Sequence, residues 1–181
     1  CRRDWIKAGM DISWDEVVNQ ARAAEPLRSI IDPDAPEFYA GGNMEKKIRA
    51  FCERTGQPIP ETVGQVARCI YESLALKYRH ALEGLEKMKG QRIDSLNIVG
   101  GPINNRFLDQ LIADSLDRTV VTGPVEGAAI GNLLTQAMAL GHISGLEELR
   151  QVVRNSEPVE VWQPNHTPQW EAAYEKMLTF L

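Results

Sequence analysis

Hydrophobic residues recur along this chain with a helical period in most segments and with a strand-like pattern in only a few. The helical stripes predict seven helices, the longest running from a capping box at Thr62 to about Met88. Residues 26–42 hold three prolines and two glycines and are expected to form a loop. The other six helices are expected around residues 14–24, 44–52, 107–116, 130–138, 146–153 and 170–178.

Two short β-type runs each lead into a glycine-containing turn and then into a helix. Ser95–Val99 ends at Gly100 and Gly101, and Thr119–Thr122 ends at the segment Gly123–Asn132. Two consecutive strand–turn–helix units predict a parallel α/β sheet, whose ligands bind at the carboxyl ends of the strands.

Two strands do not make a stable sheet alone, so the balance of seven helices to two strands is unusual. Two explanations are open. A further strand lies in a segment that resembles a loop, such as Val159–Trp162, or the remaining strands lie on sequence outside this chain.

Composition and charge limit the partners. The 181 residues are 43% hydrophobic and 25% charged, which suits one globular domain. A net charge of −5 disfavours nucleic acid, and no run approaches the ~18 apolar residues of a membrane span. Sparse cysteines without metal-ligand spacing indicate a reducing cytoplasm. The first residue is Cys1, not Met, so we expect a piece cut from a longer protein.

No set of catalytic side chains is recognisable, and we assign neither a catalytic residue nor a metal ligand to this chain. His80, His142 and His166 are scattered and share no motif. Cys52 and Cys69 lie on neighbouring predicted helices and are expected to pack as small hydrophobic residues, with a disulfide as the alternative.

The candidate binding residues are Gly100, Gly101, Asn104 and Asn105. The glycine pair could let a nucleotide approach the backbone, with helix N–H groups facing a phosphate. The alternative is a tight turn without a ligand. The pattern is neither a Walker A loop nor GxGxxG. The two asparagines could bond a base or ribose; otherwise Asn104 caps the helix and Asn105 is merely exposed.

The second turn offers weaker candidates. Glu126 could touch a ligand, but complementing the dipole of its helix is the simpler interpretation. Gly127 and Gly131 share one helix face and either allow close packing against a strand, which we favour, or leave room for a flat ring. Asn132 is a further possible hydrogen-bond partner of a base.

With these segments in view, the chain resembles the carboxy-terminal part of the FGGY family of carbohydrate kinases, most closely its rhamnulokinase branch. The likeness runs nearly from end to end, and the glycine pair is common to the whole family. The segments that carry it are Arg49–Glu61, Ala67–Tyr78, Leu96–Gln110 and Gly123–Asn132.

The resemblance implies a helix-rich part of a ribonuclease-H-like (actin-like ATPase) α/β domain. Residues 1–181 would be the nucleotide-binding domain of a two-domain sugar kinase, without the amino-terminal domain and without the first strands of this one. It further implies that ATP, with Mg²⁺, phosphorylates L-rhamnulose to L-rhamnulose 1-phosphate. The sugar would be bound mainly by the other domain, and Gly100 and Gly101 would lie against adenosine and the inner phosphate.

One residue departs from the family pattern, because Pro102 stands where a third glycine is usual. Proline has no N–H group, so a phosphate or ribose contact from that position is lost. Two other functions stay open: a non-catalytic nucleotide-binding or interaction module, and a kinase for another sugar such as xylulose or fuculose. Unpaired sheet edges also lead us to expect self-association of the isolated chain.

Overall fold

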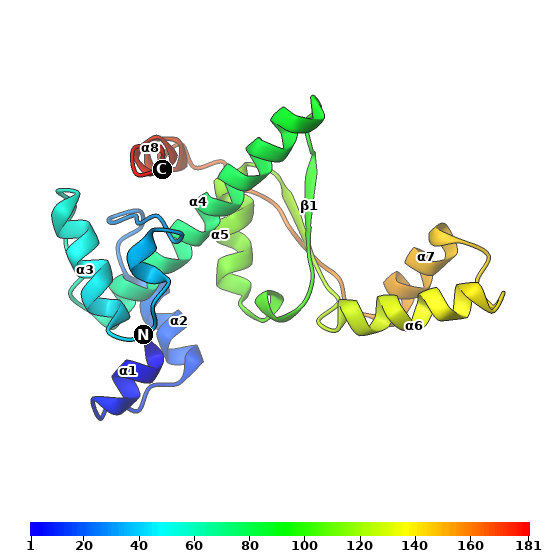
Figure 1. The fold of residues 1–181 in the computed structure, drawn as a ribbon, viewed down its shortest axis with the longest axis horizontal. Coiled ribbons are helices and arrows are strands. Elements are labelled where there is room, and N and C mark those ends of the chain that lie inside the picture. Colours follow the sequence, from blue (N-terminus) through cyan, green and yellow to red (C-terminus); the bar gives the residue numbers. More distant parts are fainter.

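The computed structural model describes residues 1–181 except the side chain of Pro102, so our expectation for that residue lies outside the described residues. Over the described part the chain forms eight α-helices, two short 3₁₀ helices and one sheet of three strands (Figure 1). The α-helices are α1 (Arg2–Lys7), α2 (Trp14–Ala23), α3 (Met44–Arg54), α4 (Val63–Lys89), α5 (Arg106–Leu116), α6 (Gly127–Ala139), α7 (Leu146–Ser156) and α8 (Gln169–Leu178). The strands are β1 (Ser95–Ile98), β2 (Thr119–Thr122) and β3 (Glu160–Trp162), and the 3₁₀ helices span Pro36–Phe38 and Gly101–Asn104.

Helix α4 is the axis of the molecule and begins and ends where the sequence predicts. The Thr62 side chain accepts from the Gln65 N–H at 3.2 Å, and the Gln65 side chain accepts from the Thr62 N–H at 3.3 Å, which completes the capping box. The helix ends at Gly90, whose φ of +67° is left-handed. The helix has 27 residues, and its ribbon runs diagonally through the body (Figure 1).

Two hydrophobic cores lie along α4. The first joins α4 to α5, the sheet and α8, and the second joins the start of α4 to α1, α2, α3 and the loop between α2 and α3. Residues buried completely or nearly so in the two cores include Leu76, Ile112, Val120, Met177, Ala21, Ile48 and Val66.

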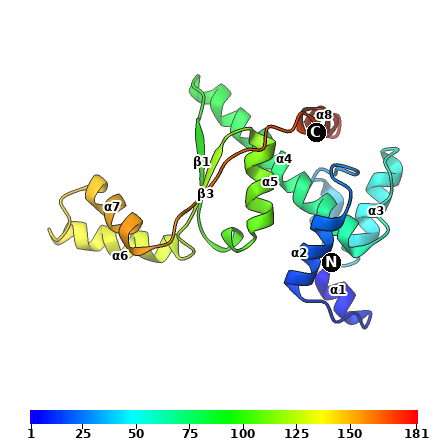
Figure 2. The same ribbon diagram turned by 180° about the vertical axis from the view of Figure 1, so that it is seen from behind.

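The sheet is mixed, with the order β1-β2-β3. Strands β1 and β2 are parallel, with Ser95 opposite Thr119, which confirms the two strand–turn–helix units. Strand β3 lies in the segment for which the sequence left strand and loop open, and it pairs antiparallel to β2, with Val120 opposite Trp162. Because α6 and α7 form a hairpin, they return the chain to the carboxyl end of β2, so the next strand runs the opposite way (Figure 2).

Helix α1 was not predicted. It has six residues, and its one buried side chain, Trp5, donates its indole N–H to Glu45 on α3. A helix this short shows no hydrophobic period, so only the tertiary contact of Trp5 marks it.

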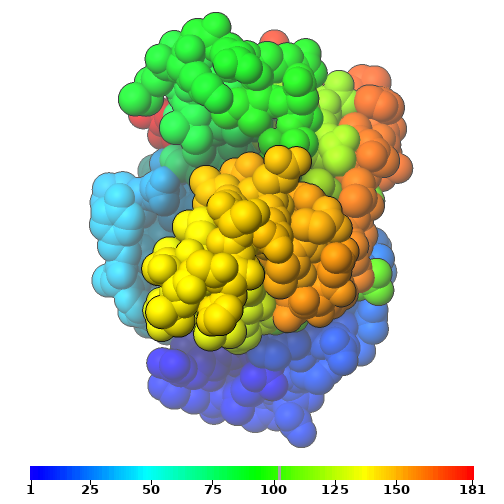
Figure 3. Space-filling view, turned by 90° about the vertical axis from the view of Figure 1, so that its right-hand side faces the viewer, coloured from blue at the N-terminus to red at the C-terminus, as the bar shows by residue number. Residues whose placement is uncertain are grey.

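The hairpin of α6 and α7 stands apart from the body (Figures 1 and 2), and in Figure 3 it faces the viewer in front of the rest of the molecule. No residue of either helix is buried, and all of them are described. Leu133, Leu140 and Leu146 are 66%, 75% and 60% exposed. These leucines leave an apolar surface on the hairpin that no other part of the chain covers. Among the described residues, no helix combines the length and apolar character needed to cross a bilayer.

Candidate functional site

The turn after β1 contains two glycines with different tasks. Gly100 has a φ of +87°, in the left-handed region, so glycine is needed there to make the turn. At Gly101 a Cβ would meet none of the described atoms within 4 Å. The space beside Gly101 is therefore open, as close approach of a ligand to the backbone requires.

A second turn meets the first at the same edge of the sheet. The Gly100 N–H donates to the Pro124 carbonyl at 3.1 Å, and the Gly123 N–H donates to the Ile98 carbonyl at 3.0 Å. Because β1 and β2 are parallel, these turns lie together at the carboxyl ends of both strands. This edge is where the sequence places the candidate site.

The structure reverses the two structural roles predicted for Asn104 and Asn105, those of helix cap and exposed residue. Asn105 caps α5, since its side-chain oxygen accepts from the Leu108 N–H at 3.2 Å, whereas Asn104 is exposed at the end of the 3₁₀ helix. Asn104, not Asn105, is therefore the side chain left facing solvent. The reason is that the 3₁₀ turn takes up one more residue before α5 begins.

Both asparagines line an open hollow of about 430 Å³ between α2 and the start of α5. The remaining lining comes from Asp15, Val18, Asn19, Arg22, Arg106 and Phe107. The sequence analysis missed the α2 side. Asp15, Asn19 and Arg22 follow the i, i+4, i+7 spacing of one helix face, but nothing local shows which element that face meets.

Aromatic and cationic side chains fix the two walls of the hollow to each other. The guanidinium groups of Arg22 and Arg68 lie 4.9 and 5.6 Å from the centre of the Phe107 ring. Tyr71 meets the same ring edge-on at 6.0 Å. Burial raises the pKa of Tyr71, and a hydrogen bond with the Asn105 side chain opposes this. The Phe107 ring of the hollow is therefore held from three sides, and Arg22 is exposed beside it.

Asp109 lies one turn further along α5 and is completely buried. Neither of its carboxylate oxygens has a hydrogen-bond partner among the described residues. Burial raises the pKa of this carboxyl to about 6; the charge of Glu160 adds to the rise and that of Arg106 opposes it. At neutral pH the folded chain therefore holds a buried carboxylate that costs free energy.

Replacing Asp109 by asparagine is expected to stabilise the chain at pH 8 by about 2–3 kcal/mol and to change little near pH 4. The folded-state pKa lies above the usual value near 3.9, so the wild-type chain loses stability as pH rises from about 4 through about 6. Asparagine has a similar shape and no proton to lose. Urea unfolding of both chains at pH 4, 6 and 8 measures the difference.

Asp94→Asn is the matched control, because the Asp94 side chain is 94% exposed. Its stability should follow that of the wild type at every pH. An Asp109→Asn gain that is the same at pH 4 and pH 8 would show that ionisation of Asp109 is not its cause.

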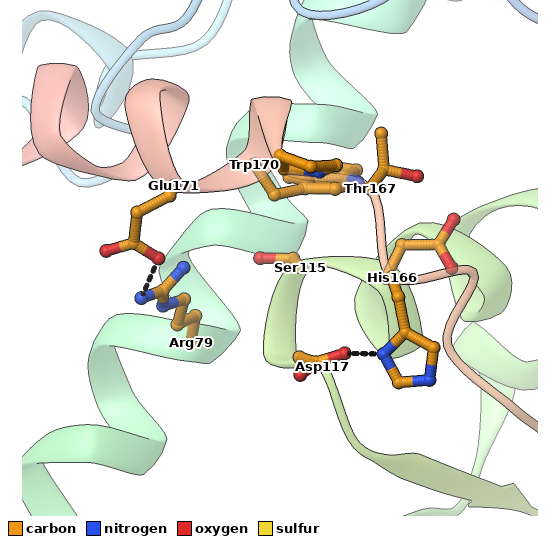
Figure 4. A pocket seen from close by; sticks show the side chains of 9 residues that line it. Arg79, Ser115, Asp117, His166, Thr167, Trp170 and Glu171 are labelled. Carbon is orange, nitrogen blue, oxygen red and sulfur yellow. Dashed lines mark hydrogen bonds and ion pairs between the residues drawn. The ribbon is translucent and has the colours of Figure 1, made fainter.

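A smaller pocket of about 200 Å³ lies at the opposite end of α5, where α4 and the segment before α8 meet it (Figure 4). Its polar groups pair with each other: Asp117 with the His166 ring, and Arg79 with Glu171 at 2.8 Å. It is at the amino edge of β2, away from both glycine turns. We interpret it as an anchor for the C-terminal segment.

The weaker candidates are now placed. Glu126 is exposed at the N-cap of α6 and makes no side-chain capping bond. Asn132 is exposed and accepts from the Gln136 side chain at 2.8 Å. Gly127 packs closely, as favoured, but against Val99, the residue that follows β1, because a Cβ there would lie 3.2 Å from Val99; Gly131 faces open space.

Cys52 and Cys69 are buried, reduced and in contact, in agreement with packing as small hydrophobic residues. The contact and burial raise the pKa of Cys69. Both thiols lie in the second core, between α3 and α4, and not at either glycine turn.

Known proteins match this arrangement. The family model of the C-terminal domain of FGGY carbohydrate kinases covers residues 1–140. The chain belongs to the FGGY family. Among curated relatives, rhamnulokinase of Bacteroides thetaiotaomicron is 41% identical over 174 residues, which cover 96% of this chain and 35% of that protein. Rhamnulokinase of Bacillus subtilis is 40% identical, covering 85% of this chain and 32% of that protein.

Solved structures support the fold of this FGGY chain. Plasmodium falciparum glycerol kinase with ADP covers 97% of the chain with a TM-score of 0.69 and 13% identity, using 34% of its own length. Ligand-bound xylulose kinase of Lactobacillus acidophilus covers 93% with a TM-score of 0.63 and 19% identity, using 33% of its length. The chain spans about a third of the curated relatives it matches. The expected actin-like architecture is confirmed at the level of the fold.

Proposed function

We propose that this chain is the nucleotide-binding C-terminal part of a kinase that uses ATP to phosphorylate L-rhamnulose to L-rhamnulose 1-phosphate. The observation that carries the proposal is the identity of 41% with a rhamnulokinase over 96% of the chain. The rest of the protein would supply the amino-terminal domain, the first strands of this domain, most of the sugar site and the aspartate base. The cytoplasm would be its compartment.

The geometry of the glycine edge supports a nucleotide at this place. Gly101 leaves space at its Cα where adenosine and the inner phosphate can approach the backbone. The start of α5 points N–H groups toward the same edge, which favours a negative phosphate. The hollow between α2 and α5 is lined in part by Asn104 and Asn105 and is large enough for a base.

In this proposal the residues of the chain bind and orient rather than react. Asn104 donates to or accepts from the base or ribose, and Asn105 holds the first turn of α5 in place. When bound, ATP would supply the phosphoryl group and Mg²⁺ would offset the charge of its phosphates. Phosphoryl transfer requires groups on both sides of the transferred phosphate, so this chain supplies one wall of the cleft.

The isolated chain is expected to show no turnover with ATP, Mg²⁺ and L-rhamnulose, whereas the full-length kinase should reach about 1–100 s⁻¹. The reason is that the base and the sugar wall lie outside the chain in this proposal. ADP release measures both. Turnover by the isolated chain in that range would contradict the assignment to half of an active site.

The same assay separates the alternatives. D-Xylulose or L-fuculose as the better substrate of the full-length protein would reassign the sugar and leave the nucleotide site unchanged. A full-length protein that binds ATP but phosphorylates none of these sugars would instead be a nucleotide-binding module.

A further inference from the structure

The two glycine turns are joined to each other through their backbones. Their backbones exchange two hydrogen bonds, from Gly100 to Pro124 and from Gly123 to Ile98. A movement of the second turn is therefore passed directly to the backbone on both sides of Val99. The position of the first turn depends on how α6 is seated after the second.

Gly127 determines how closely α6 is seated. It is the first residue of α6, and a Cβ built on it would lie 3.2 Å from Val99 Cβ and 3.6 and 3.7 Å from the two methyl carbons. The first of these distances is shorter than ordinary van der Waals contact. Val99 directly precedes Gly100, so a side chain at Gly127 would push on the residue that leads into the turn.

Gly131 provides an internal comparison. It lies one helical turn further along the same face of α6, and a Cβ there would meet none of the described atoms within 4 Å. The two glycines therefore share a helix and its propensity cost but differ in their distance from Val99. Only Gly127 lies against the residue that joins β1 to the proposed nucleotide site.

We propose that Gly127 is a positioning residue for ATP: its missing side chain lets Val99 and the start of α6 pack together, and this contact sets the Gly100–Gly101 turn in the position that meets the nucleotide. The inference rests on the proposed function, because it assumes that this turn binds ATP. Gly127 itself need not touch the ligand.

The test compares Gly127→Val with Gly131→Val in the full-length kinase. We expect Gly127→Val to raise the KM for ATP about tenfold or more, with the KM for sugar and kcat within about twofold of wild type. Gly131→Val should change none of the three by more than about twofold. Thermal unfolding and the Kd for ATP, measured by calorimetry, accompany the kinetics.

A compensating change separates positioning from general damage. Val99→Gly removes the Cβ that would lie 3.2 Å from the new side chain, together with both methyl carbons, so the double variant Gly127→Val with Val99→Gly should recover part of the affinity for ATP. Gly127→Ala, which adds the Cβ alone, should show a smaller rise in the KM for ATP and serves if Gly127→Val does not fold.

Three results would overturn the inference. They are equal ATP kinetics for the Gly127 and Gly131 variants, a loss of sugar affinity and kcat that parallels a fall in Tm, and a double variant no better than Gly127→Val. A wild-type protein that neither binds nor uses ATP would instead reject the proposed function, which is a separate outcome of the same experiment.

Discussion

Replacing Arg68 by alanine is expected to lower the free energy of unfolding of this chain by about 3–5 kcal/mol. Arg68 pairs with Glu72 at 2.7 Å, and the Glu72 side chain is only 1% exposed. Burial raises the pKa of Glu72, and Arg68 counteracts it. Without the guanidinium, Glu72 either stays charged and unpaired or takes up a proton, and both cost stability.

Arg68 has a second task that adds to this effect. Its Nη1 donates to the carbonyl groups of Ala21, Arg22 and Ala24 at 2.8–3.1 Å, so it satisfies the C-terminal end of α2. Its loss should also loosen the α2 wall of the hollow. Urea unfolding followed by circular dichroism measures the stability.

Arg54→Ala is the matched control for Arg68→Ala. Arg54 pairs with Glu37 at 2.6 Å, but its side chain is 60% exposed, so its removal should cost less than about 1 kcal/mol. If both variants lose the same free energy, burial of the Arg68–Glu72 pair is not what makes it important.

Replacing Gly101 by valine in the full-length kinase is expected to raise the KM for ATP at least tenfold without unfolding the protein. The structure gives Gly101 and Gly100 different roles. A side chain at Gly101 meets no described atom within 4 Å, so it enters only the space proposed for adenosine. Gly100 is the glycine that the turn requires, because its φ is +87°.

The control is Gly100→Val, which should lower the free energy of unfolding by about 1–2 kcal/mol because an L side chain is strained at positive φ. Sugar binding by calorimetry should stay unchanged in Gly101→Val. If that variant keeps a normal KM for ATP, the glycine pair is only a turn and the proposed nucleotide site is wrong.

Local signals predicted most of the elements. The capping box at Thr62, the stop at Gly90 and the pairing of β1 with β2 all follow from residues close together in sequence, so periodicity and turn chemistry are sufficient. The seven predicted helices are present. The direction of β3 depends on the path of α6 and α7, which no local pattern specifies.

Only the part of the candidate site that follows β1 could be predicted from the sequence. Gly100, Gly101 and both asparagines lie in one segment, and of these the two asparagines line the hollow. Its α2 wall depends on packing between helices some 80 positions apart in the sequence, which a single sequence does not show. Asp109 carried a signal that went unused: it shares the helix face of Ile112 and Leu116, both buried.

The projecting hairpin of α6 and α7 makes the chain uneven in its resistance to local opening. Helices α4 and α5 share a core, but neither α6 nor α7 has a buried residue or contributes to that core, so the hairpin can open without breaking it. The amide hydrogens of the hairpin then exchange with solvent through local opening, whereas those of α5 exchange only when the whole chain unfolds. A ligand or a further part of the protein that holds α6 in place would bring both regions under one cooperative transition.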